Sequence, residues 1–168
     1  MAKLVLTAVG DDRAGLVRSL ADIVSARGGN WETSELAELA GVFAGVILVS
    51  VPDDAVDALR ADLAGLAGLL QVTPHVGSDE PAPIGAQIEF SVLGNDHPGI
   101  VRDISETLAR HHFSIDHLTS RTLEAPMAGG TLFEATVRAR PLEGSDLDAV
   151  VVDLERLAGE IQVDLTVA

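Results

Sequence analysis

The chain contains no cysteine, no tyrosine and a single tryptophan among its 168 residues. The absence of cysteine excludes disulfides, thiolate metal sites and cysteine nucleophiles. Lysine occurs once, at Lys3, and the net charge is −15. Affinity for DNA or RNA comes largely from Lys and Arg side chains that neutralise phosphates. We therefore expect no direct binding to nucleic acid.

The sequence also has no long hydrophobic run. Its longest apolar stretch, 42–51, is far shorter than the roughly 20 residues that cross a bilayer. The first residues lack the basic region and apolar core of a secretory signal. These features predict a cytoplasmic protein without a membrane segment. Hydrophobic residues make up 47% of the chain and charged residues 22%, which is enough to build one or two small packed domains.

One short segment occurs twice. Residues 10–17 read Gly-Asp-Asp-Arg-Ala-Gly-Leu-Val, and residues 94–101 read Gly-Asn-Asp-His-Pro-Gly-Ile-Val. Each copy follows a run of alternating apolar residues and precedes apolar residues at helical spacing. A loop of glycine and small polar residues before a helix is suited to holding a small charged ligand.

The rest of the chain repeats with these loops. The alternation predicts strands over 3–9, 30–39, 42–51 and 70–76, with helices that begin near Leu16 and Pro52. The second half predicts strands over 87–93, 113–124, 131–140 and 161–163, with helices from about Pro98 and over 147–157. The order β-α-β-β-α-β in each half predicts two ferredoxin-like units of the α+β class. We expect domains at 1–76 and 87–168, joined by a Pro- and Gly-containing linker at 77–86.

The two halves differ on one face of the third strand. Alignment of Phe43 with Phe133 predicts that Phe43, Ile47 and Val49, like Phe133, Val137 and Ala139, face the helices. The opposite face carries Val42, Ala44, Val46 and Leu48 in the first half, but Leu132, Glu134, Thr136 and Arg138 in the second. A sheet with one solvated face should alternate as the second does. We infer that the first face is covered by the other repeat, a second chain or a partner; the alternative is a mildly apolar exposed face.

The two β-α-β-β-α-β units, each with Gly-Asx-Asp-x-x-Gly-[Leu/Ile]-Val after its first strand, resemble tandem ACT domains. With no catalytic domain attached, the arrangement is similar to the glycine cleavage system transcriptional repressor family. Ala14 stands where that family usually has proline. The resemblance implies a regulatory homodimer that binds a small amino acid without chemistry on it and needs no cofactor. It also implies a protein partner, through which any transcriptional repression would pass.

The same resemblance places ligands where the loop, the start of the first helix and the second strand meet a neighbouring ACT unit. The corresponding residues in the first half are Asp11, Asp12, Arg13, Ala14, Gly15 and Leu16, with Asn30 and Trp31 at the second strand. In the second half they are Asn95, Asp96, His97, Pro98, Gly99 and Ile100, with Ser114 and Ile115. This placement would put Trp31 beside the first site.

Helix amides could bind a carboxylate at these loops, and Asp or Asn side chains could accept from an ammonium group, so glycine or serine would satisfy both. For Asp12 and Asp96 individually, we favour a simpler role as helix caps. The histidines at 97, 111, 112 and 117, with Asp116, offer only a weak case for a metal site, because adjacent helical positions diverge by about 100°. No motif for catalysis is present. A module for protein interaction without a ligand and a small ferredoxin-like enzyme remain the alternatives.

Overall fold

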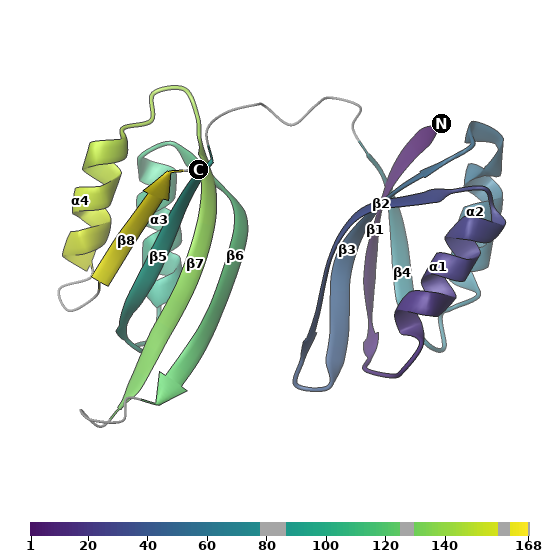
Figure 1. The fold of residues 1–168 in the computed structure, drawn as a ribbon, viewed down its shortest axis with the longest axis horizontal. Helices are drawn as coiled ribbons and strands as arrows, with labels where there is room; N and C mark the ends of the chain where they lie inside the picture. The colour runs from purple at the N-terminus through teal and green to yellow at the C-terminus, as the bar shows by residue number, and fades with distance from the viewer. Residues whose placement is uncertain (78–86, 125–129, 158–161, 168) are drawn as a thin grey trace. The chain divides into compact units, whose positions relative to one another are not determined.

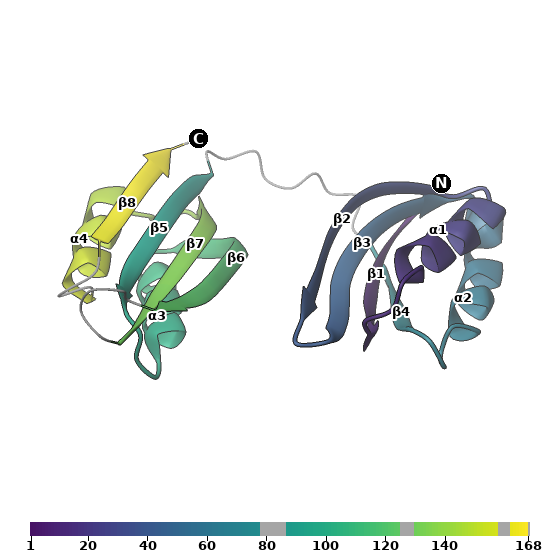
Figure 2. The ribbon, with the colours of Figure 1, turned by 60° about the horizontal axis from the view of Figure 1, so that its bottom comes forward.

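The computed structural model describes residues 1–77, 87–124, 130–157 and 162–167, and the chain forms two compact units, residues 1–82 and 83–168. Each unit contains a four-stranded antiparallel sheet with its helices on one face (Figures 1 and 2). The predicted order and the ferredoxin-like fold are confirmed. The predicted linker lies outside the described residues except for Gly77, whose amide donates to the carbonyl of Lys3 at 2.9 Å.

Unit 1 consists of β1 (Ala2–Asp11), α1 (Leu16–Ala26), β2 (Asn30–Leu39), β3 (Val42–Val51), the 3-10 turn η1 (Asp53–Ala55), α2 (Val56–Ala64) and β4 (Gln71–Val76). The strands lie in the order β2-β3-β1-β4. Strand β1 extends two residues beyond its predicted end, because β3 continues to pair with it as far as Asp11 opposite Val42. The helix predicted from Pro52 begins as a 3-10 turn and becomes α-helical at Val56.

Unit 2 consists of β5 (Ile88–Asn95), α3 (Ile100–Arg110), β6 (Phe113–Glu124), β7 (Thr131–Pro141), α4 (Leu147–Leu157) and β8 (Gln162–Val167). Its sheet order, β6-β7-β5-β8, repeats that of unit 1. The last strand was predicted at 161–163; Ile161 lies outside the described residues, and β8 pairs with β5 from Gln162 to Val167.

The core of each unit lies between its sheet and its helices. In unit 1 the alternate residues Ile47 and Val49 of β3 are fully buried, as predicted, and Leu20 and Leu59 meet them from the two helices. The alternate β7 residues Phe133, Ala135, Val137 and Ala139 are also buried. On the other face of β3, Val42 and Val46 each keep 45% of their surface exposed.

Candidate functional site

The first glycine-containing loop is a tight connection between β1 and α1. The amide of Asp12 donates to the carbonyl of Gly41 at 2.8 Å, which ties the loop to the turn between β2 and β3. Gly15 then adopts a left-handed conformation, with φ 94°, at the N-cap of α1. Residues 11–15 are exposed, whereas Leu16 is buried in the core. The loop therefore presents its polar residues to solvent from a fixed backbone.

The second loop has the same backbone geometry with different side chains. The amide of Asp96 donates to the carbonyl of Thr131 at 2.8 Å, and Gly99 has φ 95° at the N-cap of α3. Pro98 replaces the first loop's Ala14, and His97 replaces Arg13. The two loops thus share one conformation although four of their eight residues differ in kind.

The interpretation of Asp12 and Asp96 as helix caps is wrong. The N-cap positions are Gly15 and Gly99, and neither helix has a side-chain capping hydrogen bond. Each aspartate lies three residues before its N-cap, so it is bound through its backbone amide and its carboxylate is exposed. The first-turn amides of α1 and α3 are left without a capping side chain, as an anion-binding helix start requires.

Charged groups lie close to each loop. In the first loop the guanidinium of Arg13 is 3.5 Å from the carboxylate of Asp11, and both side chains are more than half exposed. At the second loop Arg102 donates to one carboxylate oxygen of Asp103 from two nitrogens, at 2.9 and 2.8 Å. This hydrogen-bonded carboxylate raises the pKa of Arg102. Each loop therefore has one cation beside it that is already engaged by a carboxylate.

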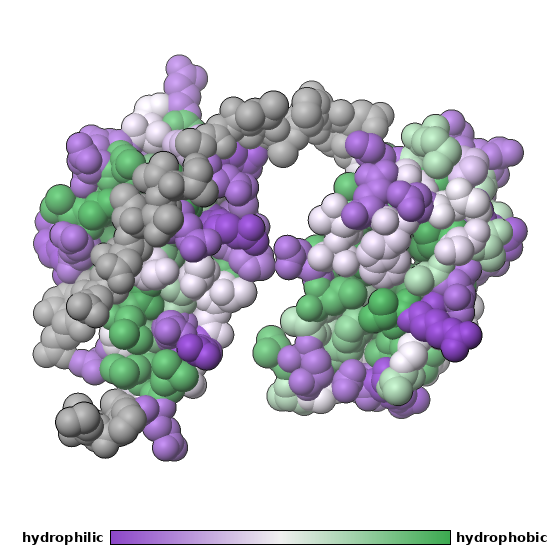
Figure 3. All heavy atoms as spheres, in the orientation of Figure 1, coloured by the Kyte–Doolittle hydropathy of each residue, from purple (hydrophilic) through white to green (hydrophobic). Residues whose placement is uncertain are grey.

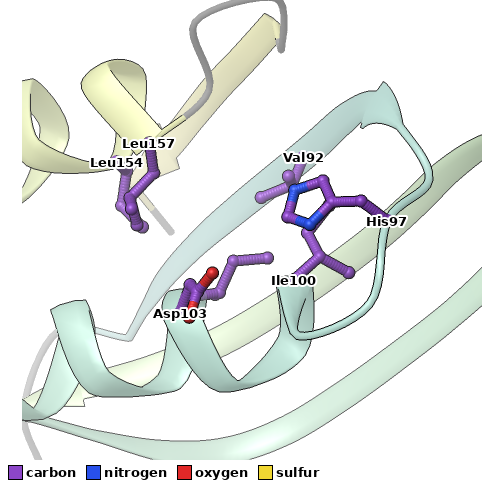
Figure 4. A pocket seen from close by; sticks show the side chains of 7 residues that line it. Val92, His97, Ile100, Asp103, Leu154 and Leu157 are labelled. Carbon is purple, nitrogen blue, oxygen red and sulfur yellow. The ribbon is translucent and has the colours of Figure 1, made fainter.

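A small cavity opens beside the second loop in unit 2 (Figure 4). Its polar lining residues are His97 and Asp103, and its walls are apolar: Val92, Ile100, Ile104, Leu154 and Leu157. The cavity volume is about 20 Å³, enough for roughly one water molecule. Of the predicted site residues, only His97 and Ile100 line it. Asp103 was missed in the sequence, although it lies on α3 one turn after Gly99.

The predicted second-strand residues lie at the opposite end of the sheet from the loop of their own unit. Asn30 is opposite Ser50, which in turn is opposite Lys3, whereas the loop begins at Asp11. Lys3 and Asp11 are eight steps apart along β1, which is about 26 Å at the usual rise of a strand. Ser114, opposite Arg140, is separated from the second loop in the same way. Within one unit, the loop and the strand start therefore lie too far apart to contact one small ligand.

The expected position of Trp31 beside the first loop is wrong within unit 1. Trp31 is opposite Val49 and packs partly buried against the core near the far end of the sheet. A ligand in the loop of unit 1 would not touch it there.

Both second strands contain a β-bulge directly after the predicted ligand-binding pair. The register shifts between Trp31 and Thr33 in β2, and between Ile115 and His117 in β6. In unit 2 the extra residue, Asp116, accepts from Arg140 at 2.9 Å. The Nε atom of Arg140 is buried and has no hydrogen-bond partner among the residues that the structure describes. Sequence alternation alone gave no sign of this ion pair, although the bulge breaks the alternation at that point.

The histidines do not converge. His111 bonds Asp153 with 2.8 Å between Nε2 and the carboxylate, and His97 lies at the second loop. Arg110 and Arg156 also contact Asp153, and hydrogen bonding to His111 is the main reason that the pKa of Asp153 is lowered. Among the described residues, no three His, Asp or Glu side chains could hold a metal ion. No described helix is long and apolar enough to cross a membrane.

Two family models, each described as an ACT domain, match residues 2–77 and 88–147. The glycine cleavage system transcriptional repressor of Escherichia coli (strain K12) is 32% identical over 126 residues, which cover 73% of this chain and 66% of that protein. A crystal structure of an unknown protein from Galdieria sulphuraria aligns over 99% of this chain and 98% of its own, with 30% identity and a TM-score of 0.84. A structure provisionally assigned as a glycine cleavage system transcriptional repressor shares the fold. It aligns over 99% of this chain and 97% of its own, with 22% identity and a TM-score of 0.69.

Proposed function

The chain belongs to the ACT-domain family, which supports a regulatory, ligand-binding role, and we propose that its two glycine-containing loops bind a small amino acid. The observation that carries the proposal is the shared backbone geometry of the loops. Gly15 and Gly99 have φ values within one degree of each other, although Arg13 and Ala14 are replaced by His97 and Pro98. Conserving a backbone shape while the side chains change is expected where backbone amides do the binding.

The proposed ligand is a zwitterion, with glycine and serine as the first candidates. Its carboxylate would bind the uncapped first-turn amides of α1 or α3. Its ammonium group would donate hydrogen bonds to the exposed carboxylates of Asp11 and Asp12 in the first loop, or to the side-chain oxygens of Asn95 and Asp96 in the second. The Escherichia coli relative is named for the glycine cleavage system, which is consistent with a glycine-related signal.

The proposed assembly is a homodimer that acts on a partner protein. The loop and the second-strand start of one unit lie at opposite ends of its sheet, so a site that includes Asn30 with Trp31, or Ser114 with Ile115, needs a neighbouring unit. A net charge of −15 opposes binding to DNA, so any repression of transcription would pass through a DNA-binding protein. Such coupling requires the ligand to prefer one assembly state. The match to regulatory domains favours a protein without catalytic activity.

Calorimetric unfolding of the full chain tests whether an amino acid binds to the native protein. Binding to the native state raises Tm by mass action, and a concentration of 100 times the Kd adds about 2.7 kcal/mol to the free energy of unfolding. Acetate and glycinamide serve as control ligands, because acetate lacks the ammonium group and glycinamide lacks the carboxylate. We expect glycine or serine to raise Tm and both controls to have little effect. An unchanged Tm with every common amino acid, and no heat in titration calorimetry, would contradict the proposal.

A further inference from the structure

The face of the unit 1 sheet that its helices leave uncovered is apolar over three adjacent strands. We call it the open face of unit 1, and it is defined by alternate residues of β1, β2 and β3. The register aligns these in rows, with Val5 beside Leu48 and Val9 beside Ala44. Its apolar members are Val5, Val9, Ala37, Leu39, Val42, Ala44, Val46 and Leu48. Leu39 is 76% exposed, and Val9, Val42 and Val46 are each 44–45% exposed, so the face is a contiguous apolar patch and not one exposed side chain.

The fold itself does not require this apolar surface. Unit 2 has the same topology, and at the positions of Ala44, Val46 and Leu48 it carries Glu134, Thr136 and Arg138. Glu134 is paired there with Arg121 of the neighbouring strand, as expected for a solvated face. Figure 3 shows hydrophobic residues on the visible surface of both units, and in unit 1 they gather in the half near the hairpin of β2 and β3. The apolar residues of unit 1 therefore indicate a contact with another surface.

We propose that the open face of unit 1 binds the same face of a second copy of this chain. The charges at the two ends of β1 favour a self-complementary contact, whereas Glu35, on the edge strand β2 in the row of Val46, would face Glu35 of the other copy. Lys3 and Asp11 both belong to this face and lie at opposite ends of β1, opposite Ser50 and Val42. A two-fold axis that stacks the sheets with their β1 strands antiparallel places Lys3 of each copy over Asp11 of the other.

The same two-fold arrangement also matches side-chain size. The two-fold axis passes over the central row of Thr7 and Val46. It therefore places Leu48 of one copy over Ala44 of the other. Large side chains then lie over small ones, as in packed sheet pairs. The three strands of the open face give about 480 Å² by strand spacing and rise, and the polar edge strand β4 brings the whole sheet face to about 600 Å², or about 1,200 Å² for both copies. That total reaches the lower end of stable interfaces.

Other occupants fit the surface less well. The open face of unit 1 has two acidic residues, Glu35 and Asp11, whereas the chain as a whole has a net charge of −15. A cationic partner would therefore bind more strongly to other surfaces of the chain than to this face. The open face of unit 2 carries the charged residues Arg121, Glu134 and Arg138, and burial against valine and leucine would remove these charges from water. The proposed contact shares Asp11 with the proposed amino-acid site but requires no ligand there.

Sedimentation equilibrium of the full chain tests the contact. In the V46T/L48R variant, unit 1 takes the residues that unit 2 carries at the equivalent positions, so the ACT fold should tolerate them. We expect a dimer for the native chain and a dissociation constant raised by at least about 100-fold in the variant, because each copy would bury an unpaired guanidinium. The matched control, T136A/R138A in unit 2, should remain dimeric. Circular dichroism and Tm check that both variants fold.

Charge exchange tests the orientation. Lys3→Asp and Asp11→Lys should each weaken the dimer, and the double variant K3D/D11K should restore it, because both contacts are re-formed with reversed polarity. A native chain that remains monomeric in sedimentation equilibrium at about 1 mM overturns the proposal. A dimer that survives V46T/L48R, or one that is lost with T136A/R138A, also overturns it.

Discussion

Gly15 and Gly99 occupy the same place in the two units, each in a left-handed backbone conformation at the residue before a helix. An alanine there strains the backbone by about 1–2 kcal/mol. No atom lies within 4 Å of a Cβ built at Gly15, so the expected loss in G15A is purely conformational. Urea unfolding followed by Trp31 emission should show a lower midpoint for G15A, because this tryptophan lies in unit 1.

The control is Gly68→Ala, because Gly68 also has open space around its Cβ but no left-handed conformation. We expect its midpoint to change little. G99A should lower the stability of unit 2 and leave the Trp31 transition in place. An unchanged midpoint for G15A would contradict the conformation assigned to the loop.

The ion pair between Arg27 and Asp62 predicts a pH dependence for unit 1. Arg27 follows α1 and Asp62 lies on α2, and two hydrogen bonds of 2.6 and 2.9 Å join them. These hydrogen bonds lower the pKa of Asp62 below its ordinary value. The resulting stabilisation is complete above the unfolded carboxyl pKa of about 4 and is lost as the pH falls through the lower folded value.

Asp62→Asn should therefore lower the Trp31 unfolding midpoint at pH 7, and the difference from the native chain should narrow as the pH falls below about 4. Asp57→Asn is the matched control on the same helix. The Asp57 side chain is 97% exposed and lies 3.9 Å from Arg60, so its removal should have little effect at any pH. A difference for D62N that stays constant down to pH 2 would argue against this ion pair.

Gly45 of β3 predicts an asymmetry between the units. Its equivalent in unit 2 is the buried Ala135, yet a Cβ at position 45 would overlap the carbonyl oxygen of Glu35 and the side chain of Leu36. We expect G45A to destabilise unit 1 by about 1–3 kcal/mol, as overpacking does. A135G should destabilise unit 2 by about 1 kcal/mol. Urea unfolding measures both, with Trp31 emission for unit 1 and circular dichroism for unit 2. A native midpoint for G45A would contradict the close approach of β2 to β3.

The sequence predicted the fold well, because its signals are local and repeated. Alternation at Ile47 and Val49 identified the buried face of β3, and Gly41 marked the hairpin turn. The duplication allowed each half to support the interpretation of the other. Strand ends were less accurate, since the end of β1 depends on how far β3 pairs with it.

The site was predicted only in part, because its geometry depends on contacts that are distant in sequence. Asp12 looked like a cap from its position before a helix, but the helix starts at Leu16, after a left-handed Gly15. Trp31 was expected near the loop by family resemblance, whereas the register of β2 on β3 places it at the far end of the sheet. The apolar face of β3 could be predicted from the sequence alone, because it follows from aligning the first repeat with the second.

A side-chain cap does exist in the chain, at Asp146. Its carboxylate accepts from the amide of Ala149 at 3.0 Å, and its carbonyl accepts from Val150 as α4 begins. Asp146→Ala should therefore lower the stability of unit 2 by about 1 kcal/mol. Asp12→Ala and Asp96→Ala should change stability by less than about 0.5 kcal/mol, because neither carboxylate makes a capping hydrogen bond.

These three variants separate structure from ligand binding. If the loops bind an amino acid as proposed, D12A and D96A should weaken its affinity while their Tm without ligand stays at the native value. D146A should show the reverse: a lower Tm and an unchanged affinity. Titration calorimetry with glycine and serine measures the affinities, and circular dichroism measures the melting. Loss of stability in D12A equal to that in D146A would restore the capping role. Native affinity in both D12A and D96A would remove these carboxylates from the proposed site.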